Sequence, residues 1–320
     1  MYRYKTVYIK EPCGDQKSGR AEEAVDSADP VILLQFDRLS EAVGRVSAAG
    51  HTDAALVHGF TARSGGVSEG RCRSLNLSFR RENARTRVME NYRRAAYALD
   101  VPLDSITCVP QVHSGRVLHV TQALRGIGVA RQTPDEILAC GYDAMVTNTR
   151  GITLCTIHGD CVPVLFYDPV HKAVGLAHSG WRGTAERISR NVVRKMALCF
   201  GSAPEDLSVV IGPCIGMCCF EVGPEVCEAF FGAFGSLAED PDYMCMRRCT
   251  EAGEKKDSEA ASKGYISLER FIFATLTECG VCPEHIDVTG ICTSCDPERW
   301  FSHRRDHGKT GAMAAFIGLR

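Results

Sequence analysis

Short apolar runs separated by turn residues dominate the pattern of hydrophobic and polar positions along this chain. Two of them lie close together: one leads into His-Gly-Asp-Cys at residues 158–161, and the other, residues 173–177, leads into His-Ser-Gly-Trp-Arg-Gly. Both have the length and composition of strands, and Asp168-Pro169 between them is a turn signal. We therefore predict two neighbouring strands that place Cys161 and His178 in loops at their ends, where functional groups often lie.

The rest of the chain shows the same mixture of short strands and amphipathic helices. Apolar runs predict an edge strand over residues 1–9 and further strands over 56–60, 106–114, 207–211 and 286–288. Ordered structure resumes at residues 31–34, and residues 143–146 lead into the central stretch. Apolar residues at helical spacing predict helices over 38–47, 83–99, 185–200, 224–234 and 267–279, the third with Thr184 as its N-cap.

Two polar stretches interrupt this order. Residues 11–30 are rich in Gly and Asp without periodicity, and residues 247–263 are strongly charged. We interpret the first as a flexible linker and the second as an insertion. Because no clear linker follows Pro30, we predict an N-terminal strand and linker over residues 1–30 and one domain over residues 31–320.

Composition is that of an ordinary globular chain. It has 320 residues, 45% of them hydrophobic and 24% charged, and a formal net charge of −2. This charge argues against nucleic-acid binding, and the apolar runs are shorter than a membrane span. The N-terminus lacks the pattern of a signal peptide. We expect a cytoplasmic protein with neither nucleic-acid nor membrane partners.

The chain has 17 cysteines, but they do not indicate a disulfide scaffold. Because the chain is long, the count is odd and no export signal is visible, we expect mostly reduced thiols. Cysteines in apolar runs pack as small hydrophobic residues; they include Cys140, Cys155, Cys199 and Cys279.

Two cysteine motifs need separate judgement. Cys292 and Cys295 form a C-x-x-C pair, but one such pair alone is a weak signal for a metal or redox site. Cys214 and Cys218 follow Pro213, as in the Pro-Cys-x-x-Cys of zinc nucleobase deaminases. Their spacing has one residue too many and the preceding His-x-Glu is absent, so we exclude that interpretation.

The strongest candidate chemistry comes from three strand ends, at His113, Cys161 and His178. A thiolate with two imidazoles suits zinc or copper, and three protein ligands leave a fourth position open, as in catalytic sites. The spacing is too long for a zinc finger and fits a site assembled from separate loops. Two alternatives fit the same residues: a Cys-His nucleophile pair, and three unrelated core or surface side chains.

Arginines in polar or Gly-rich loops beside these motifs are candidate phosphate or ribose contacts, because a guanidinium binds oxyanions through paired hydrogen bonds. They are Arg63, Arg182, Arg304 and Arg305, and the alternative for each is a solvated surface position. The chain has no G-x-x-x-x-G-K-[ST] and no convincing G-x-G-x-x-G, so neither a P-loop NTPase nor dinucleotide chemistry is supported.

Eight segments, collinear from about residue 55 to the C-terminus, resemble one known family. It is variously called laccase-domain protein, multicopper polyphenol oxidase, peptidoglycan-editing factor and purine nucleoside phosphorylase. The segments are HGFTARSGGVSEG (58–70), SLNLS (74–78), VPQVHSGRV (109–117), YDAMVTNTRGITL (142–154), GDCVPVLFYDP (159–169), GLAHSGWRGT (175–184), IGPCIGMCCFEVG (211–223) and WFSHRRDHGKTG (300–311).

This resemblance implies a mixed α/β fold in which two packed mixed β-sheets are flanked by helices (α/β/β/α). It implies that His113, Cys161 and His178 ligate zinc, with copper as the other candidate metal. It also implies phosphorolysis of adenosine, inosine, guanosine and S-methyl-5'-thioadenosine to base and ribose 1-phosphate, and deamination of adenosine. We expect purine nucleosides and phosphate as ligands, and a monomer or small homo-oligomer.

The implied site has two parts. The expected catalytic residues are the three ligands together with Asp160, and the expected substrate contacts are Arg63, Asn76, Gln111, Arg182 and His158. The chain departs from the family pattern at His158-Gly159, where many members carry Thr-Ala, and at Ala312, where an Arg is common. The helix near 267–276 also lacks the usual Ala-Asn. These changes bear on substrate preference and leave the three ligands untouched.

Two other functions fit the same family. One is a copper-dependent polyphenol oxidase, which needs many His ligands, whereas this chain has ten histidines and no H-x-H pair. The other is a metal-binding accessory protein in cell-wall editing, without catalysis of its own.

Overall fold

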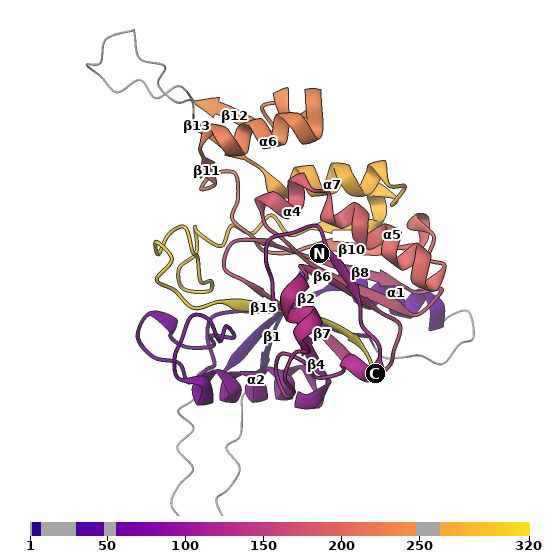
Figure 1. Ribbon diagram of the computed structural model, residues 1–320, viewed down its shortest axis with the longest axis vertical. Helices are drawn as coiled ribbons and strands as arrows, with labels where there is room; N and C mark the ends of the chain where they lie inside the picture. The colour runs from indigo at the N-terminus through magenta and orange to yellow at the C-terminus, as the bar shows by residue number, and fades with distance from the viewer. Residues whose placement is uncertain (1, 8–29, 48–55, 248–262) are drawn as a thin grey trace, which may run out of the picture.

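Two six-stranded mixed sheets pack face to face, with helices on both outer surfaces (Figure 1). The computed structural model describes residues 2–7, 30–47, 56–247 and 263–320. The first sheet has the order β1 (Tyr2–Val7), β2 (Val31–Phe36), β3 (Leu56–Thr61), β15 (Met313–Leu319), β7 (Ile152–His158) and β4 (Ile106–Cys108). The second has the order β14 (Ile286–Val288), β10 (Ser208–Ile211), β8 (Val162–Asp168), β9 (Ala173–Ser179), β6 (Ala144–Thr147) and β5 (Val117–His119). The predicted α/β/β/α class is confirmed.

Alternating side chains of the central strands build the cores on either side of the first sheet. On β15, Met313, Ala315 and Ile317 belong to the core between the two sheets. Ala314 and Phe316 point the other way and pack against α2 (Arg85–Leu99). Because both faces of β15 are covered, its sequence is a continuous apolar run without polar alternation.

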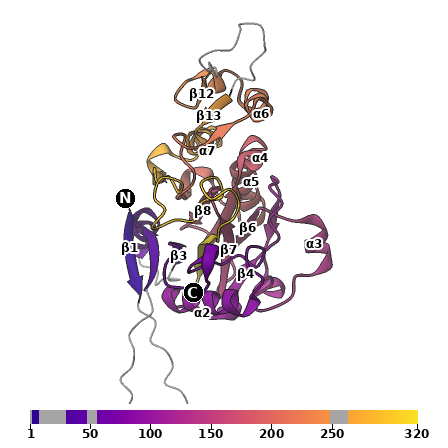
Figure 2. The ribbon, with the colours of Figure 1, turned by 90° about the vertical axis from the view of Figure 1, so that its left-hand side faces the viewer.

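Helices close the remaining faces. The outer face of the second sheet packs against α5 (Ile188–Phe200), α6 (Pro224–Phe234) and α7 (Leu268–Glu278). Leu39 and Ala42 of α1 (Asp37–Ser47) join the core between the sheets. Figure 2 shows α3 (Asp135–Cys140) projecting at the side of the molecule. The short α4 (Trp181–Ala185) precedes α5.

A third, small sheet lies beyond α7, beside α6, at the top of both views (Figures 1 and 2). It has the order β11 (Glu221–Val222), β13 (Lys263–Ile266) and β12 (Met244–Arg247). Single 3-10 turns complete the fold at Gly70–Cys72, Leu103–Ser105, Gln122–Leu124, Pro204–Asp206, Gly235–Glu239 and Pro283–His285.

Four of the five predicted helices are present with bounds that differ by at most two residues. The fifth prediction, one helix over 185–200 capped by Thr184, is wrong in detail. Helix α4 ends at Ala185, Arg187 takes a left-handed conformation (φ 58°), and α5 begins at Ile188. The Thr184 hydroxyl donates to the Gly180 carbonyl within α4 and caps nothing.

The prediction that the strands before Cys161 and His178 are neighbours is also wrong. The run before Cys161 is β7, in the first sheet, whereas His178 lies on β9 in the second. The neighbour of β9 is β8, which begins directly after Cys161 and pairs Pro163 with His178. Cys161 and His178 are therefore brought together through β8. The strand predicted over 106–114 is shorter than expected, because β4 ends at Cys108.

Other predictions have mixed outcomes. Strand β1 is an edge strand, as expected. The linker up to residue 29 and residues 248–262 of the charged insertion lie outside the described residues.

The described cysteines are free thiols, as expected. Among the four cysteines predicted to be buried, only Cys155 is fully buried, and Cys140 is exposed. No helix in the described part of the chain is long and apolar enough to cross a membrane.

Candidate functional site

A cavity of about 580 Å³ lies where β4, β7 and β9 end. Its wall is formed by the segments that follow these strands, together with residues 77–81, Ile215, Phe220 and the pair His303-Arg304. This volume falls within the range of sites that bind small molecules and cofactors.

The structure brings His113, Cys161 and His178 together at this cavity. The Cys161 Sγ lies 3.9 Å from the His113 Nε2, and the two imidazole rings meet edge to face with centroids 5.0 Å apart. The three possible ligand atoms lie within 4.8 Å of one another, so this group can hold a metal ion.

These three side chains come from both sheets. His113 sits in the loop after β4 of the first sheet, with a left-handed backbone (φ 62°). His178 lies on β9 of the second sheet, and Cys161 lies in the turn that carries the chain from β7 to β8. The group therefore stands at the junction of the two sheets.

Asp143 fixes the orientation of His178. Its Oδ1 lies 2.9 Å from the Nδ1 of His178, so the Nε2 is left to face the Cys161 sulfur. Its Oδ2 accepts hydrogen bonds from the amides of Val112 (3.1 Å) and Ser114 (2.7 Å) and from the Ser114 hydroxyl. Burial by itself raises the pKa of Asp143, but the hydrogen bonds from His178 and Ser114 outweigh it and lower the pKa to about 2.

Sequence reasoning did not identify Asp143. The only signal was a carboxylate that directly precedes the buried strand β6, and its partner is far away in the sequence.

Cys161 and His178 form a polarised pair. Burial raises the pKa of the Cys161 thiol, but His178 and His113 beside it lower the pKa to about 6. Burial lowers the pKa of His178, but Cys161 and Asp143 raise it to about 9. A deprotonated sulfur beside two imidazoles suits a metal ligand and also a nucleophile.

Gly180 lets His113 and Cys161 approach closely. A Cβ at this position would lie 2.9 Å from the His113 Cδ2 and 3.1 Å from the Cys161 Sγ. Any side chain there would displace these two residues.

His158 and Asp160 hold the turn that carries Cys161. The His158 ring lies between the Thr156 hydroxyl (2.7 Å) and the Cys161 carbonyl (3.0 Å). Burial and the nearby His178 keep the pKa of His158 well below its usual value, so the ring is neutral. The Asp160 carboxylate accepts hydrogen bonds from the Thr293 hydroxyl and the Arg304 amide, each at 2.7 Å. Both residues line the cavity, but their polar atoms already have partners within the protein.

Among the predicted substrate contacts, Gln111 and Arg182 also line the cavity. The Gln111 amide pairs with both backbone groups of Ile157, at 2.9 and 2.8 Å. Arg182 is exposed, with its guanidinium carbon 4.2 Å from the centre of the Trp181 ring.

Arg63 and Asn76 are not brought to the cavity wall. The Arg63 guanidinium donates to the carbonyls of Arg73 and Pro297. Asn76 is fully buried, and its side-chain oxygen accepts from the amides of Ser78 and Ala312. Both side chains therefore join separate segments of the backbone by hydrogen bonds.

The remaining two candidate arginines differ in their position relative to the cavity. Arg304 lines the cavity, whereas Arg305 pairs with Asp306 away from it.

Several lining residues were missed by sequence reasoning. They are Phe79, Arg80, Arg81, Trp181, Phe220 and His303. The Arg81 guanidinium lies 3.1 Å from the His303 Nδ1 and donates to the Gly308 carbonyl at 2.9 Å. The available signal was the Phe-Arg-Arg that directly follows SLNLS, a basic pair adjoining a recognised segment.

Comparisons with known proteins agree on one family. The family model described as multi-copper polyphenol oxidoreductase laccase matches residues 57–320. The chain is 34% identical over 266 residues to purine nucleoside phosphorylase YlmD of Bacillus subtilis (strain 168), covering 83% of this chain and 89% of that protein. It is 37% identical over 270 residues to YlmD of Geobacillus stearothermophilus, also named purine nucleoside phosphorylase, covering 83% and 91%. The crystal structure of the Bacillus licheniformis hypothetical protein YfiH matches with a TM-score of 0.72 at 32% identity, covering 83% of this chain and 93% of that one.

Proposed function

Because the chain belongs to the multi-copper polyphenol oxidoreductase laccase family, in which similar proteins carry the name purine nucleoside phosphorylase, we propose that it is a zinc-dependent purine nucleoside phosphorylase. Its substrates are adenosine, inosine, guanosine and S-methyl-5'-thioadenosine, which it splits with phosphate, and it also deaminates adenosine. The observation that carries this proposal is the group His113, Cys161 and His178 at a cavity of nucleoside size, beside four arginines.

The donor set and its geometry favour zinc. In a tetrahedral zinc site with the usual bond lengths, a sulfur and a nitrogen ligand lie about 3.6 Å apart. The 3.9 Å between the Cys161 Sγ and the His113 Nε2 is close to that value. When bound, a zinc ion with one open position supplies a Lewis acid that lowers the pKa of a water molecule or polarises a substrate oxygen.

Arginines beside this group suit a phosphate ion. Arg80, Arg81, Arg182 and Arg304 all line the cavity. Arg81 and Arg304 already donate to backbone carbonyls, those of Gly308 and Glu221. Within the described part of the chain, no side chain or carbonyl accepts a hydrogen bond from Arg182. We therefore assign the main phosphate contact to Arg182, whose planar fork can donate two parallel hydrogen bonds.

Aromatic side chains offer a place for the purine base. Phe79, Trp181 and Phe220 line the cavity. Phe79 is itself supported by Tyr92, with stacked rings 5.5 Å apart. Flat apolar faces of this kind bury a purine ring and leave its polar edges for hydrogen bonds.

The two reactions require two positions of the nucleoside. Phosphorolysis takes place at C1' of the ribose and deamination at C6 of the base. These carbons are too far apart to occupy one reactive position in a single pose. The neutral His158 ring and the Asp160 carboxylate hold the Cys161 turn by hydrogen bonds, and this turn serves both poses.

The test uses purified protein with adenosine in the presence and absence of phosphate. Phosphate-dependent release of adenine and ribose 1-phosphate is expected, together with slower formation of inosine. Cys161→Ala should abolish both, because it removes the sulfur ligand at the cavity. Phenol oxidation with copper, or no turnover by a folded, metal-loaded chain, would contradict the proposal.

A further inference from the structure

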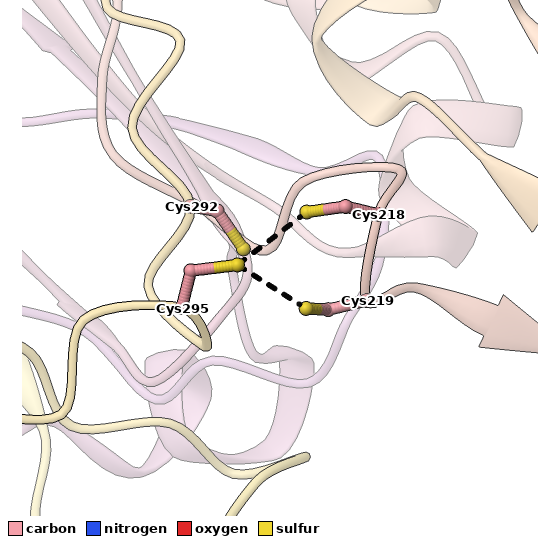
Figure 3. A group of neighbouring side chains, drawn as sticks. All are labelled: Cys218, Cys219, Cys292 and Cys295. Carbon is pink, nitrogen blue, oxygen red and sulfur yellow. Dashed lines mark hydrogen bonds between the residues drawn. The ribbon is translucent and has the colours of Figure 1, made fainter.

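Four cysteines from two loops meet at a second place in the fold. Cys218 and Cys219 lie in the loop between β10 and β11, and Cys292 and Cys295 lie in the loop after β14 (Figure 3). The Cys295 sulfur is 3.6 Å from that of Cys218 and 3.5 Å from that of Cys219. All four sulfurs lie within 4.8 Å of one another.

Strand pairing explains why these loops meet. Strands β10 and β14 are parallel neighbours, and their register pairs Ile211 with Val288. Loops that follow parallel neighbours leave the sheet at the same edge. Beyond the strands, the Cys214 amide donates to the Ile291 carbonyl at 3.1 Å and the Thr293 amide to the Cys214 carbonyl at 2.8 Å. These backbone hydrogen bonds join the two loops near the strands, and the four sulfurs meet farther along them.

The distances between the sulfurs fit a shared ion. A disulfide requires two sulfurs about 2.0 Å apart. Around a tetrahedral zinc with a zinc–sulfur bond of about 2.3 Å, neighbouring sulfurs lie about 3.8 Å apart. The observed distances of 3.5 and 3.6 Å lie close to the second value and far from the first.

A backbone contact at Cys292 supports the same interpretation. The Gly216 amide donates to the Cys292 sulfur at 3.2 Å. Hydrogen bonds to the side chains that hold a metal fix the direction in which the ligand atoms point. A Cβ at Gly216 would lie 3.2 Å from the Cys292 Cβ and 3.3 Å from the Cys218 sulfur, so glycine permits this close approach.

We propose that Cys218, Cys219, Cys292 and Cys295 bind one zinc ion, in a site separate from His113, Cys161 and His178. Four cysteine ligands leave no open position, which is the arrangement of a structural zinc site. Soft thiolate ligands in a tetrahedron select zinc over magnesium or calcium.

The ion fixes one wall of the cavity. The first loop also carries Ile215 and Phe220, which line the cavity. Thr293, between the two cysteines of the second loop, donates to the carboxylate of Asp160 beside Cys161. The Arg304 guanidinium donates to the carbonyls of Cys219 (3.4 Å) and Glu221 (2.6 Å). A zinc ion that joins the loops therefore holds the cavity side chains without touching a substrate.

Zinc content of the full chain tests the proposal. Protein purified with a reducing agent should hold about two zinc ions per chain, and Cys161→Ala should retain about one. Adding Cys295→Ser to Cys161→Ala should remove that remaining ion. The matched control adds Cys140→Ser, a change at an exposed cysteine on α3, and should keep it.

A second measurement covers the case in which Cys295→Ser does not fold. Cobalt loaded into the Cys161→Ala chain should give the strong charge-transfer absorption of a tetrahedral thiolate site. In the same Cys161→Ala chain, a strong chelator should raise the number of thiols that react with a chromogenic disulfide. Each of three results would overturn the proposal: Cys161→Ala purified without zinc, a disulfide among the four cysteines under reducing conditions, or iron in place of zinc.

Discussion

Asp143 determines which nitrogen of His178 faces the sulfur of Cys161. A carboxylate bound to one imidazole nitrogen sets the tautomer and makes the other nitrogen a better ligand. This carboxylate is fully buried and accepts three further hydrogen bonds from the His113 loop, so it also positions that loop. One side chain thus orients two of the three expected ligands.

Replacing this carboxylate should weaken the metal site. Asp143→Asn is expected to lower zinc affinity and activity about tenfold to a hundredfold, the usual effect of losing such a partner. A chelator competition assay measures the affinity. The matched control is Asp168→Asn, because Asp168 is equally buried and bonds His171 at the same 2.9 Å, at the far end of β8. Equal affinities in the two variants would refute the role of Asp143.

The two arginines expected to contact substrate should behave differently. Arg182→Ala is expected to raise the KM for phosphate roughly tenfold to a hundredfold, and Arg182→Lys should restore little of it, because a lysine lacks the planar fork. Arg63→Ala should instead lower the melting temperature, since Arg63 joins the carbonyls of Arg73 and Pro297. Steady-state kinetics and thermal melts separate these effects. A large rise in KM for Arg63→Ala would restore Arg63 as a substrate contact.

Among the elements, β3 carries a histidine that is buried without charge. His58 lies against Phe36, with its Nε2 3.1 Å from that residue's amide nitrogen and its ring stacked on the phenyl group. Burial lowers the pKa of His58 to about 4. An unfolded histidine titrates near 6.5, so between these two pH values the unfolded chain binds more protons. Stability must therefore fall as the pH drops through this window.

His58→Phe should remove this part of the pH dependence. Between pH 7 and pH 5 the free energy of unfolding of the wild type should fall by about 2 kcal/mol more than that of the variant. Denaturant titrations at both pH values measure the difference, in which all other titrating groups cancel. Equal losses in the two proteins would mean that His58 is already charged, or exposed, in the folded chain.

Hydrophobic periodicity predicts some of the helices and strands but not others. Helices α1, α2, α6 and α7 have one apolar face each, and their periodicity was sufficient to locate them. Strand β15 was missed because both of its faces are buried, which leaves no alternation to detect. The break between α4 and α5 depends on one left-handed residue, Arg187, whose type does not indicate it.

For the site, the segments that resemble the family indicated His113, Cys161 and His178, which the structure brings together. Asp143 and His303 could not be predicted, because their roles depend on contacts between distant segments. The same holds for the four-cysteine group. Cys292 and Cys295 were recognised as a pair, but Cys218 and Cys219 join them only through the parallel pairing of β10 with β14.

At the scale of the whole molecule, the N-terminal strand is the outermost part of the first sheet. Strand β1 pairs along its full length with β2 but adds no residue to the cavity. The family match begins only at residue 57. The proposed division of the chain near residue 30 can therefore be tested without disturbing the site.

Removing residues 1–29 should spare activity and change association. The truncated chain is expected to keep its kcat, because no cavity residue is lost. It should self-associate more strongly, because the edge of β2 would be left with unpaired backbone groups. Sedimentation velocity measures association, and nucleoside turnover serves as the control for folding. An inactive but folded and monomeric product would show that the N-terminal strand belongs to the working domain.

The origin of the three candidate ligands in both sheets has a further consequence. One ion held by His113, Cys161 and His178 would join the sheets as a cross-link. A ligand that binds only folded chains shifts the folding balance by mass action. Unfolded chains are those that cellular proteases remove. The supply of zinc would therefore set the lifetime of the protein in the cell. When zinc is scarce, the metal-free protein would be degraded and would not accumulate.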